Sequence, residues 1–267
     1  MISRLFLSAV NSVVNFITII ALLLVGSYAI YSLWDNNQIL MEAENVQEDM
    51  IKLKPTVVLN SSEEMDNSDS FAELQKINSD VCAWITMDNT KIDFPILQGE
   101  TNLTYINTDV YGNFSLAGSI YLDSRNNFEF TDTYSLLYGH HMADSRMFGD
   151  LDLYKGSEFF RKNNTGLLIL PQKAFNLKVI ACLVVASNDV WFFEPPSVQH
   201  DINGLLNYTE QNAWQLNTEI LQLARDTENV QLIALSTCSS EFPDARTIVL
   251  AVMDPFTADS LGGDKND

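Results

Sequence analysis

The chain has 267 residues, of which 46% are hydrophobic and 10% aromatic, so it can bury one ample globular core. Its 35 acidic residues outnumber its 15 basic residues, and the formal net charge is −20. This charge argues against binding to nucleic acid, which relies on Lys and Arg to neutralise phosphates, and against docking of the folded part on an anionic membrane surface. Three cysteines, an odd number, exclude a fully paired disulfide framework.

The N-terminal segment predicts a membrane anchor. Residues 5–34 are almost continuously apolar, and their densest part, residues 16–33, is long enough to cross the hydrocarbon core as a helix. Because Arg4 precedes this segment and acidic residues follow it, the N-terminus is predicted to be cytoplasmic and the rest of the chain extracellular. A cleaved signal peptide ending near Ala29 is the alternative, but apolar residues continue to Trp34. We therefore predict a single-pass anchor over residues 1–37.

A stalk and a linker are predicted to follow the anchor. Residues 38–53 have apolar positions at helical spacing among Glu and Gln, whereas residues 60–70 are polar and acidic with almost nothing to bury. We therefore assign residues 38–70 to a stalk helix and an acidic linker. The globular domain is predicted to span residues 71–257, beginning with a short helix over 71–77. The polar residues 258–267 predict a flexible tail.

From residue 81 onward, short apolar runs alternate with turns rich in Asn, Asp and Gly, a pattern typical of an all-β barrel or sandwich. Eight such runs are predicted to be strands, namely residues 82–86, 91–96, 118–122, 134–138, 166–170, 177–186, 230–235 and 247–253. Between the sixth and seventh runs, residues 200–226 have helical periodicity, which predicts one substantial helix. Residues 147–154 predict a short helical turn.

Cys238 is the first candidate for chemistry. It ends an apolar run that predicts a buried strand, and Arg246 opens the next run eight residues later. A hairpin joining the two runs would place the thiol and the guanidinium on adjacent strands. A fixed positive charge beside a thiol favours the nucleophilic thiolate and can stabilise an oxyanion. For an arbitrary cysteine, the simpler interpretation is a small buried core residue.

Histidine supplies the second candidate. Two of the three histidines, His140 and His141, directly follow a predicted strand and Gly139, at the kind of strand end where scaffolds display catalytic groups. A cysteine nucleophile needs a proton acceptor and donor, and histidine is the usual choice. The alternatives are an ordinary surface loop and an adventitious metal site, but two adjacent histidines without a third ligand are weak support for zinc. His200 lies in a polar segment and is assigned only to the start of the predicted helix.

Three motifs, in order along the chain, resemble those of class B sortases. The segment Leu-Ser-Thr-Cys at residues 235–238, followed by Arg246, resembles the nucleophile motif of that class. Leu-Tyr-Gly-His-His-Met at residues 137–142 resembles its histidine motif, and residues 83–126 contain a third set of matching segments. The similarity covers residues 81–253, most of the part predicted to be exported. It implies a mainly β fold, an eight-stranded β-barrel with peripheral helices that include a long one between strands six and seven.

The resemblance also implies roles and partners. Cys238 would be the nucleophile, His140 rather than its neighbour His141 the acid–base group, and Arg246 the residue that positions the substrate and stabilises the oxyanion. Such a cysteine transpeptidase cleaves the C-terminal sorting signal of a surface protein through a thioester and transfers the protein to an amine of a cell-wall precursor on a Gram-positive surface. No metal and no organic cofactor is implied. The membrane would be engaged through the N-terminal helix.

Several alternatives stay open at this point. The same chemistry would serve a pilin polymerase that uses a pilin lysine as the acceptor. An exported cysteine peptidase would release the acyl-enzyme to water, and a surface adhesion domain would keep Cys238 buried and inert. The sequence also leaves open the sorting signal, the oligomeric state and whether Cys82 and Cys182 form a disulfide.

Overall fold

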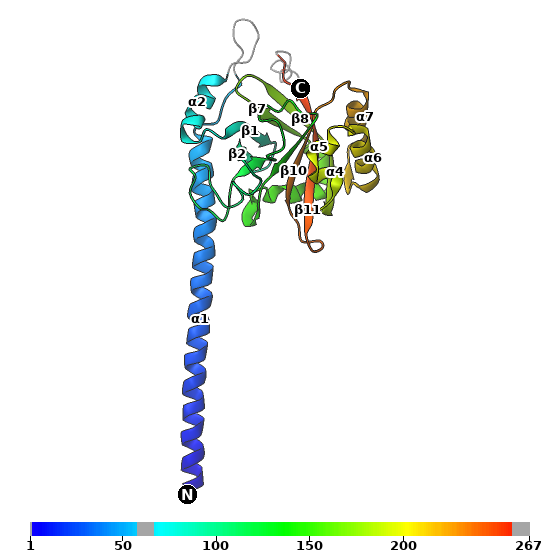
Figure 1. Cartoon of the computed structure of the whole chain (residues 1–267). Helices are drawn as coiled ribbons and strands as arrows, with labels where there is room; N and C mark the ends of the chain where they lie inside the picture. The colour runs from blue at the N-terminus through cyan, green and yellow to red at the C-terminus, as the bar shows by residue number, and fades with distance from the viewer. Residues whose placement is uncertain (1, 58–66, 258–267) are drawn as a thin grey trace. The chain divides into compact units, whose positions relative to one another are not determined.

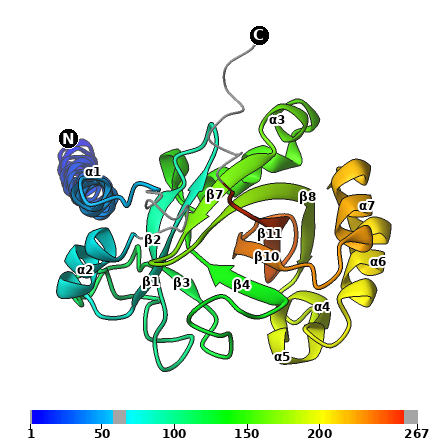
Figure 2. The same ribbon diagram turned by 90° about the horizontal axis from the view of Figure 1, so that it is seen from above.

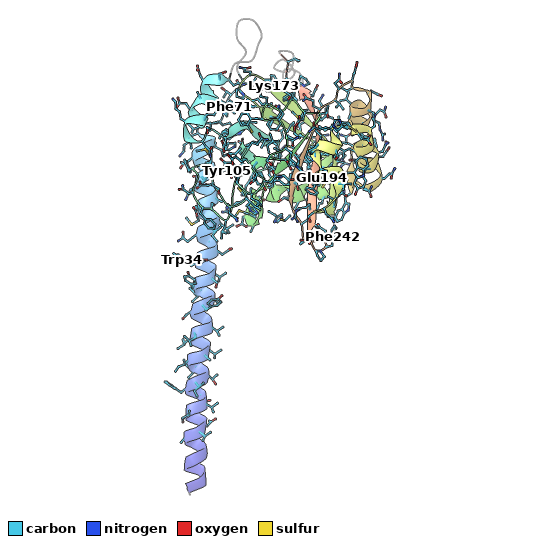
Figure 3. All side chains as sticks on the ribbon, viewed as in Figure 1. Trp34, Phe71, Tyr105, Lys173, Glu194 and Phe242 are labelled. Atoms are coloured by element: carbon cyan, nitrogen blue, oxygen red, sulfur yellow. The ribbon has the colours of Figure 1, made fainter. Side chains whose placement is uncertain are left out.

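The computed structural model describes residues 2–57 and 67–257 (Figure 1). The chain divides between Glu42 and Ala43 into two compact units. The first unit holds most of helix α1 (Ile2–Ile51), the one helix among the described residues that is long and apolar enough to cross a membrane. Exposed apolar side chains are dense along α1 from Val10 to Trp34, which Figure 3 labels.

Helix α1 continues through the region predicted to be a separate stalk helix. Its last turns, from Ala43 onward, belong to the second unit. The predicted boundaries at residues 37, 70 and 257 stay predictions. The predicted linker lies mostly outside the described residues, and the predicted tail lies wholly outside them.

The second unit is built on a closed β-barrel. Its main sheet has nine strands in the order β11-β10-β4-β3-β2-β1-β7-β8-β9, and β11 also pairs with β8. This extra pairing closes eight strands into a ring, which Figure 2 shows from above, and leaves β9 (Gln215–Leu216) outside it. The barrel strands are β1 (Val81–Met87), β2 (Asp93–Leu97), β3 (Ile120–Leu122), β4 (Tyr134–Tyr138), β7 (Thr165–Ile169), β8 (Ala174–Ala186), β10 (Leu232–Cys238) and β11 (Ala245–Pro255). Each of the eight predicted strands overlaps one of these, so the predicted barrel is confirmed.

Alternation of side chains along the strands gives the barrel two apolar faces. In β10, Ile233 and Leu235 join a buried cluster that draws on all eight barrel strands and therefore fills the interior. Leu232 and Ala234 belong instead to a second buried cluster, which includes residues from the helices between β8 and β10. A strand buried on both faces is a continuous apolar run in the sequence, and this run is what predicts β10.

The segment between β8 and β10 is helical, as predicted, but it contains several short helices in place of one long one. These are α4 (Val190–Phe193), α5 (Pro195–Val198), α6 (Ile202–Asn212) and α7 (Thr218–Asp226). The predicted single helix over residues 200–226 is thus divided after Asn212. Trp214 and Asn217 there donate backbone hydrogen bonds to β8, and the Asn217 side chain caps α7 by accepting from the amide of Ile220 at 3.2 Å.

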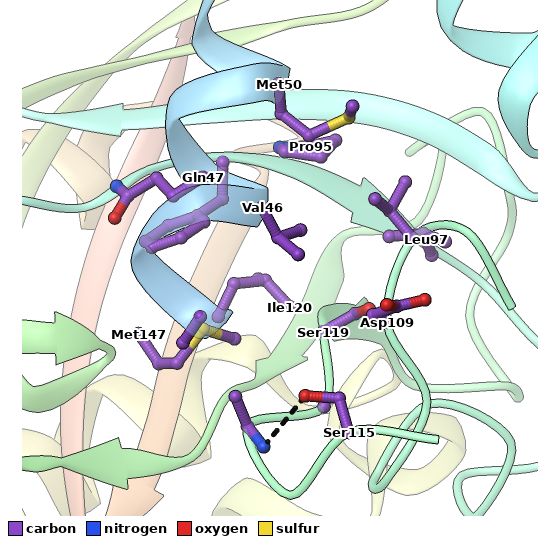
Figure 4. Close-up of a pocket in the computed structure, with 15 residues that line it drawn as sticks. Val46, Gln47, Met50, Pro95, Leu97, Asp109, Ser115, Ser119, Ile120 and Met147 are labelled. Carbon is purple, nitrogen blue, oxygen red and sulfur yellow. Dashed lines mark hydrogen bonds between the residues drawn. The ribbon is translucent and has the colours of Figure 1, made fainter. Parts of the chain in front are cut away.

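Another part of the barrel surface is covered by the end of α1 and by α2 (Ser68–Ile77), which confirms the short helix predicted over residues 71–77. Met50 from α1 and Phe71 from α2 are buried in one cluster with Trp84. Figure 4 shows Met50 and Gln47 beside Pro95 at a small cavity. The Gln47 amide donates to the carbonyl of Lys91 at 2.8 Å, so the last turns of α1 are an integral part of this unit.

A connection between β4 and β7 packs against the barrel interior. It consists of β5 (His141–Met142), the 3₁₀ helix η1 (Ala143–Ser145), β6 (Arg146–Met147), the 3₁₀ helix η2 (Gly149–Lys155) and α3 (Ser157–Lys162). Helix η2 confirms the helical turn predicted over residues 147–154. Its Leu151 and Tyr154 are fully buried in the interior cluster, which fixes η2 beside β10 and β11.

Candidate active site

Strands β10 and β11 place Cys238 directly opposite Arg246. The two strands pair antiparallel, and these residues are partners in the register. Side chains opposite each other in such a pair have Cβ atoms about 4.5–5.5 Å apart on one face of the sheet. The predicted hairpin is therefore confirmed and places Cys238 and Arg246 on adjacent strands, where the Arg246 guanidinium donates to the backbone carbonyl of Ala245 at 2.9 Å.

His140 reaches the same place from β4. That strand pairs parallel with β10, and the amide of Gly139 extends the contact by donating to the carbonyl of Ser236 at 3.1 Å. A side chain at position 139 would meet buried neighbours, because a Cβ atom would lie 2.4 Å from the Ile120 side chain and 2.7 Å from the Phe148 ring. The Nε2–H group of His140 donates to the carbonyl of Ile106 at 2.6 Å. A carbonyl can only accept, so this contact selects the tautomer protonated at Nε2 or the imidazolium.

All three predicted site residues line one open cleft, which has about 720 Å³ of empty space. Tyr138, which the sequence places at a strand end, lines it as well. The cleft is completed by residues that sequence reasoning did not single out, namely Ile106, Tyr121, Ser187 and Phe193. These residues come from two loops, strand β3 and helix α4, and no local motif connects them.

Three aromatic rings form one wall of the cleft. Tyr138 stacks on Tyr121 with ring centroids 5.2 Å apart, and on Phe193 with centroids 6.4 Å apart. The Tyr138 hydroxyl donates to the buried carboxylate of Asp123 at 3.0 Å, and Arg125 pairs with that carboxylate at 2.9 Å. Burial, followed by the charge of Asp123, raises the pKa of Tyr121 to about 12, so its hydroxyl stays a neutral donor.

The three thiols differ in their exposure to solvent. Cys82 and Cys182 are buried and free, so they do not form a disulfide with each other, whereas Cys238 is exposed. Burial raises the pKa of Cys182 to about 12 and raises the pKa of Cys82 strongly. Since the thiolate is the reactive form, Cys238 is the thiol that can act as a nucleophile in the folded chain.

Two hydroxyls beside Cys238 are unpaired. The side-chain oxygens of Ser236 and Thr237 are buried and have no hydrogen-bond partner within the described part of the chain. Both residues line the cleft, and they are only 1% and 2% exposed. Burying an unpaired hydroxyl costs free energy. By the alternation of β10, Ser236 shares the face of Cys238, whereas Thr237 shares the inner face of Ile233 and Leu235.

His141 turns away from this cleft. It lines a second hollow with Asp152, Cys238, Ser239 and Ser240, and its Nε2 atom lies 3.0 Å from Asp152 Oδ2. Across residues 2–57 and 67–257, no group of three or more His, Cys, Asp or Glu side chains is arranged to hold a metal ion. The two adjacent histidines thus occupy different surroundings.

Comparisons with known proteins agree on one family, although none of the protein-family models compared with the chain matches it. The chain is 30% identical to sortase B of Listeria monocytogenes over 175 residues, which are 65% of this chain and 68% of the relative. It is 27% identical to sortase B of Staphylococcus aureus over 182 residues, which are 68% of this chain and 72% of the relative. A solved structure of a Streptococcus pyogenes class B sortase involved in pilus biogenesis is 40% identical, with a TM-score of 0.62 over 69% of this chain and 97% of that one.

The closed eight-stranded barrel and these relatives define a cysteine transpeptidase of the sortase type. Within that type, the chain belongs to the class B sortases.

Proposed function

We propose that this sortase is a membrane-anchored extracellular enzyme in which Cys238 is the nucleophile, His140 the acid–base group and Arg246 the oxyanion-stabilising residue. The observation that carries the proposal is the convergence of these three side chains, from two strands and one loop, on a single cleft. Thiol, imidazole and guanidinium are the groups that acyl transfer through a thioester requires.

In the acylation step, the sorting signal of a surface protein lies in the cleft as an extended peptide. The Cys238 thiolate attacks the scissile carbonyl and forms the S–C bond, while the peptide C–N bond breaks. The His140 imidazolium gives its proton to the departing amine. Arg246 stabilises the negative charge on the carbonyl oxygen, a contribution of about 2–4 kcal/mol by comparison with other oxyanion donors.

In the second step, an acceptor amine attacks the thioester. A new C–N bond forms as the S–C bond breaks, and His140 takes up the proton that the amine loses. The product is an amide that joins the surface protein to its acceptor. The aromatic wall of the cleft offers apolar contact to the peptide.

The location of the enzyme is proposed from helix α1. Its apolar part has the length and hydropathy of a membrane span, and Arg4 on the N-terminal side favours a cytoplasmic N-terminus. The barrel would then work on the outer face of the membrane. Tethering raises its effective concentration near secreted substrates.

The acceptor amine has two candidates. The first is an amine of a cell-wall precursor, so that the product is anchored to the wall. The second is a lysine of a pilin, and it is favoured by the 40% identity with a sortase involved in pilus biogenesis. Both candidates use the same acylation step and differ only in the nucleophile that follows.

Mass spectrometry of reaction products tests the proposal. The full chain in detergent micelles is incubated with a panel of sorting-signal peptides and with either triglycine or a lysine amide. A peptide–amine adduct that disappears in Cys238→Ala would support transpeptidation, and the preferred amine would separate wall anchoring from pilin polymerisation. Hydrolysed peptide alone would favour a cysteine peptidase. A folded enzyme that gives neither product nor thioester would contradict the proposal.

A further inference from the structure

Behind the cleft, six polar side chains meet in one cluster, which we call the Lys155 cluster. Lys155 Nζ lies 2.8 Å from Asp152 Oδ1, donates to Ser239 Oγ at 2.9 Å and forms an ion pair with Glu241. Asp152 and Lys155 lie on η2, and the other members come from three different segments. Its members are His141, Asp152, Lys155, Ser239, Glu241 and Thr247.

Three members of the cluster directly follow the three proposed catalytic residues in the sequence. His141 comes after the acid–base histidine, Ser239 after the nucleophile and Thr247 after the arginine. His141 and Thr247 contact opposite oxygens of the Asp152 carboxylate, at 3.0 and 3.2 Å. Thr247 Oγ1 also lies 3.1 Å from Ser239 Oγ. The cluster therefore connects all three segments that carry the catalytic groups.

Strand geometry places Thr247 of the cluster and Arg246 of the cleft on opposite faces of β11. Successive side chains of a strand point to opposite sides, and in β11 the residues Val249 and Ala251 face the barrel interior. Thr247 shares their face, whereas Arg246 shares the outer face with Ile248. The contacts of Thr247 with Asp152 and Ser239 therefore fix the backbone beside Arg246 without occupying the cleft.

The cluster sets one lysine against two carboxylates, and its charged side chains are partly removed from water. The Lys155 side chain is 16% exposed, and burial alone would lower its pKa, but hydrogen bonds to Asp152 and Glu241 outweigh burial and raise it. Burial would likewise raise the pKa of Glu241, yet hydrogen bonds from Lys155 and Ser239 hold it at about 2. The charged Lys155 side chain therefore holds the β10–β11 connection against η2 through its three acceptors, which are Asp152, Ser239 and Glu241.

We propose that Lys155 and Asp152 are positioning residues of the transpeptidase, which hold the histidine, cysteine and arginine segments in register from the inner face of the barrel. This inference rests on the proposed roles of the three catalytic residues. Neither member of the pair lines the aromatic cleft, so their loss should leave the binding of the sorting signal largely intact. Misalignment of reacting groups should instead slow the chemical steps.

The test is the transpeptidation kinetics of Lys155→Met in the full chain in detergent micelles. Met keeps the aliphatic stem and removes the charge and the donors. We expect kcat to fall between about 10- and 100-fold while KM for the peptide changes less than about threefold. Lys155→Arg, which keeps the charge and the donors, should recover a large part of kcat. Lys162→Met is the matched control, since Lys162 forms only an exposed ion pair with Glu158 on α3.

The outcomes separate this proposal from the proposed function. Wild-type enzyme that forms no adduct refutes the proposed function itself. Active wild-type enzyme together with Lys155→Met that keeps kcat within about threefold overturns the positioning role, as does a loss confined to KM. If Lys155→Met does not fold, Asp152→Asn decides, because it keeps the shape of the side chain. A fall in kcat with unchanged KM supports the proposal, and an unchanged kcat overturns it.

Discussion

At the scale of single residues, access to water distinguishes three otherwise identical thiols. Cys82 and Cys182 lie inside the barrel, where burial raises the pKa of both thiols and outweighs the effect of Lys155, which lowers the pKa of Cys182, so both thiols stay protonated. Cys238 lies at the exposed end of β10, opposite Arg246. Only this position combines solvent access with a fixed positive charge.

Alkylation should therefore report one reactive thiol. We expect iodoacetamide at pH 8 to add a single label to the folded chain, at Cys238, and to label all three cysteines after unfolding in guanidinium. Peptide mapping by mass spectrometry locates the label. Cys238→Ala should give no label while folded. Labelling of Cys82 or Cys182 at a rate close to that of Cys238 would contradict this account of the fold.

The ion pairs of Lys155 should make part of the stability depend on pH. Glu241 has a folded-state pKa of about 2 against an ordinary value of 4.5, and the pKa of Asp152 is also lowered. A carboxylate with a lowered folded-state pKa stabilises the fold above its unfolded pKa, and this contribution is lost as pH falls through the folded value. Lys155, with a raised pKa, contributes below its ordinary value of 10.5.

The difference in Tm between wild type and Lys155→Met should thus be present from about pH 5 to pH 10 and should shrink as pH falls from 4.5 towards 2. Thermal unfolding followed by circular dichroism over this pH range measures it. The same series on Lys162→Met should give a difference near zero at every pH, because that ion pair is exposed. A difference for Lys155→Met that does not vary with pH would argue against the ion pairs as its source.

At the scale of elements, local periodicity explains what the sequence could predict. Each barrel strand is an apolar run that ends at turn residues, and both features are local, so the sequence alone predicts all eight strands. The division of residues 200–226 depends on backbone bonds from Trp214 and Asn217 to β8, which is distant in the sequence. Local patterns likewise do not predict the proposed role of Lys155, since its partner Ser239 is 84 residues away.

Helix α1 belongs to both compact units, and the boundary between them lies between Glu42 and Ala43. Beyond this point the helix is part of the barrel unit: Met50 is only 2% exposed, and Glu44 forms an ion pair with Arg146 at 2.6 Å. Arg146 lies in the connection that follows His141. A chain shortened to residue 71 would therefore lose part of its folded domain.

Substitution of one methionine tests this view of α1. Met50→Ala should reduce the free energy of unfolding by about 2–5 kcal/mol, because it leaves a cavity against Trp84 and Leu97. Met41→Ala is the matched control, since Met41 is 48% exposed on the same helix and should change stability by less than about 0.5 kcal/mol. Urea unfolding of both variants measures the difference. Equal stabilities would show that the end of α1 does not pack on the barrel in solution.

At the scale of the whole molecule, the apolar part of α1 and the acidic barrel domain differ in how they interact with a membrane. The apolar residues of α1 favour a bilayer, and the net charge of −20 opposes adsorption of the folded domain on anionic lipid. The proposed anchor would then hold the enzyme at the membrane without adding a contact to the cleft. Catalysis and location become separable properties of the chain.

Removal of residues 1–37 should remove the membrane location of the enzyme and leave its catalysis intact. The shortened enzyme keeps the last turns of α1, so we expect its kcat/KM with a soluble peptide and amine to stay within about twofold of the full chain. In cells, the full chain should remain in the membrane fraction after carbonate washing, and protease added outside spheroplasts should degrade the barrel. Extraction of the full chain by carbonate would contradict the anchor, and protection from protease would contradict the orientation. Tethering acts only through local concentration and cannot alter the rate with free substrates. A large fall in kcat/KM of the soluble form would therefore show that the N-terminal helix takes part in catalysis.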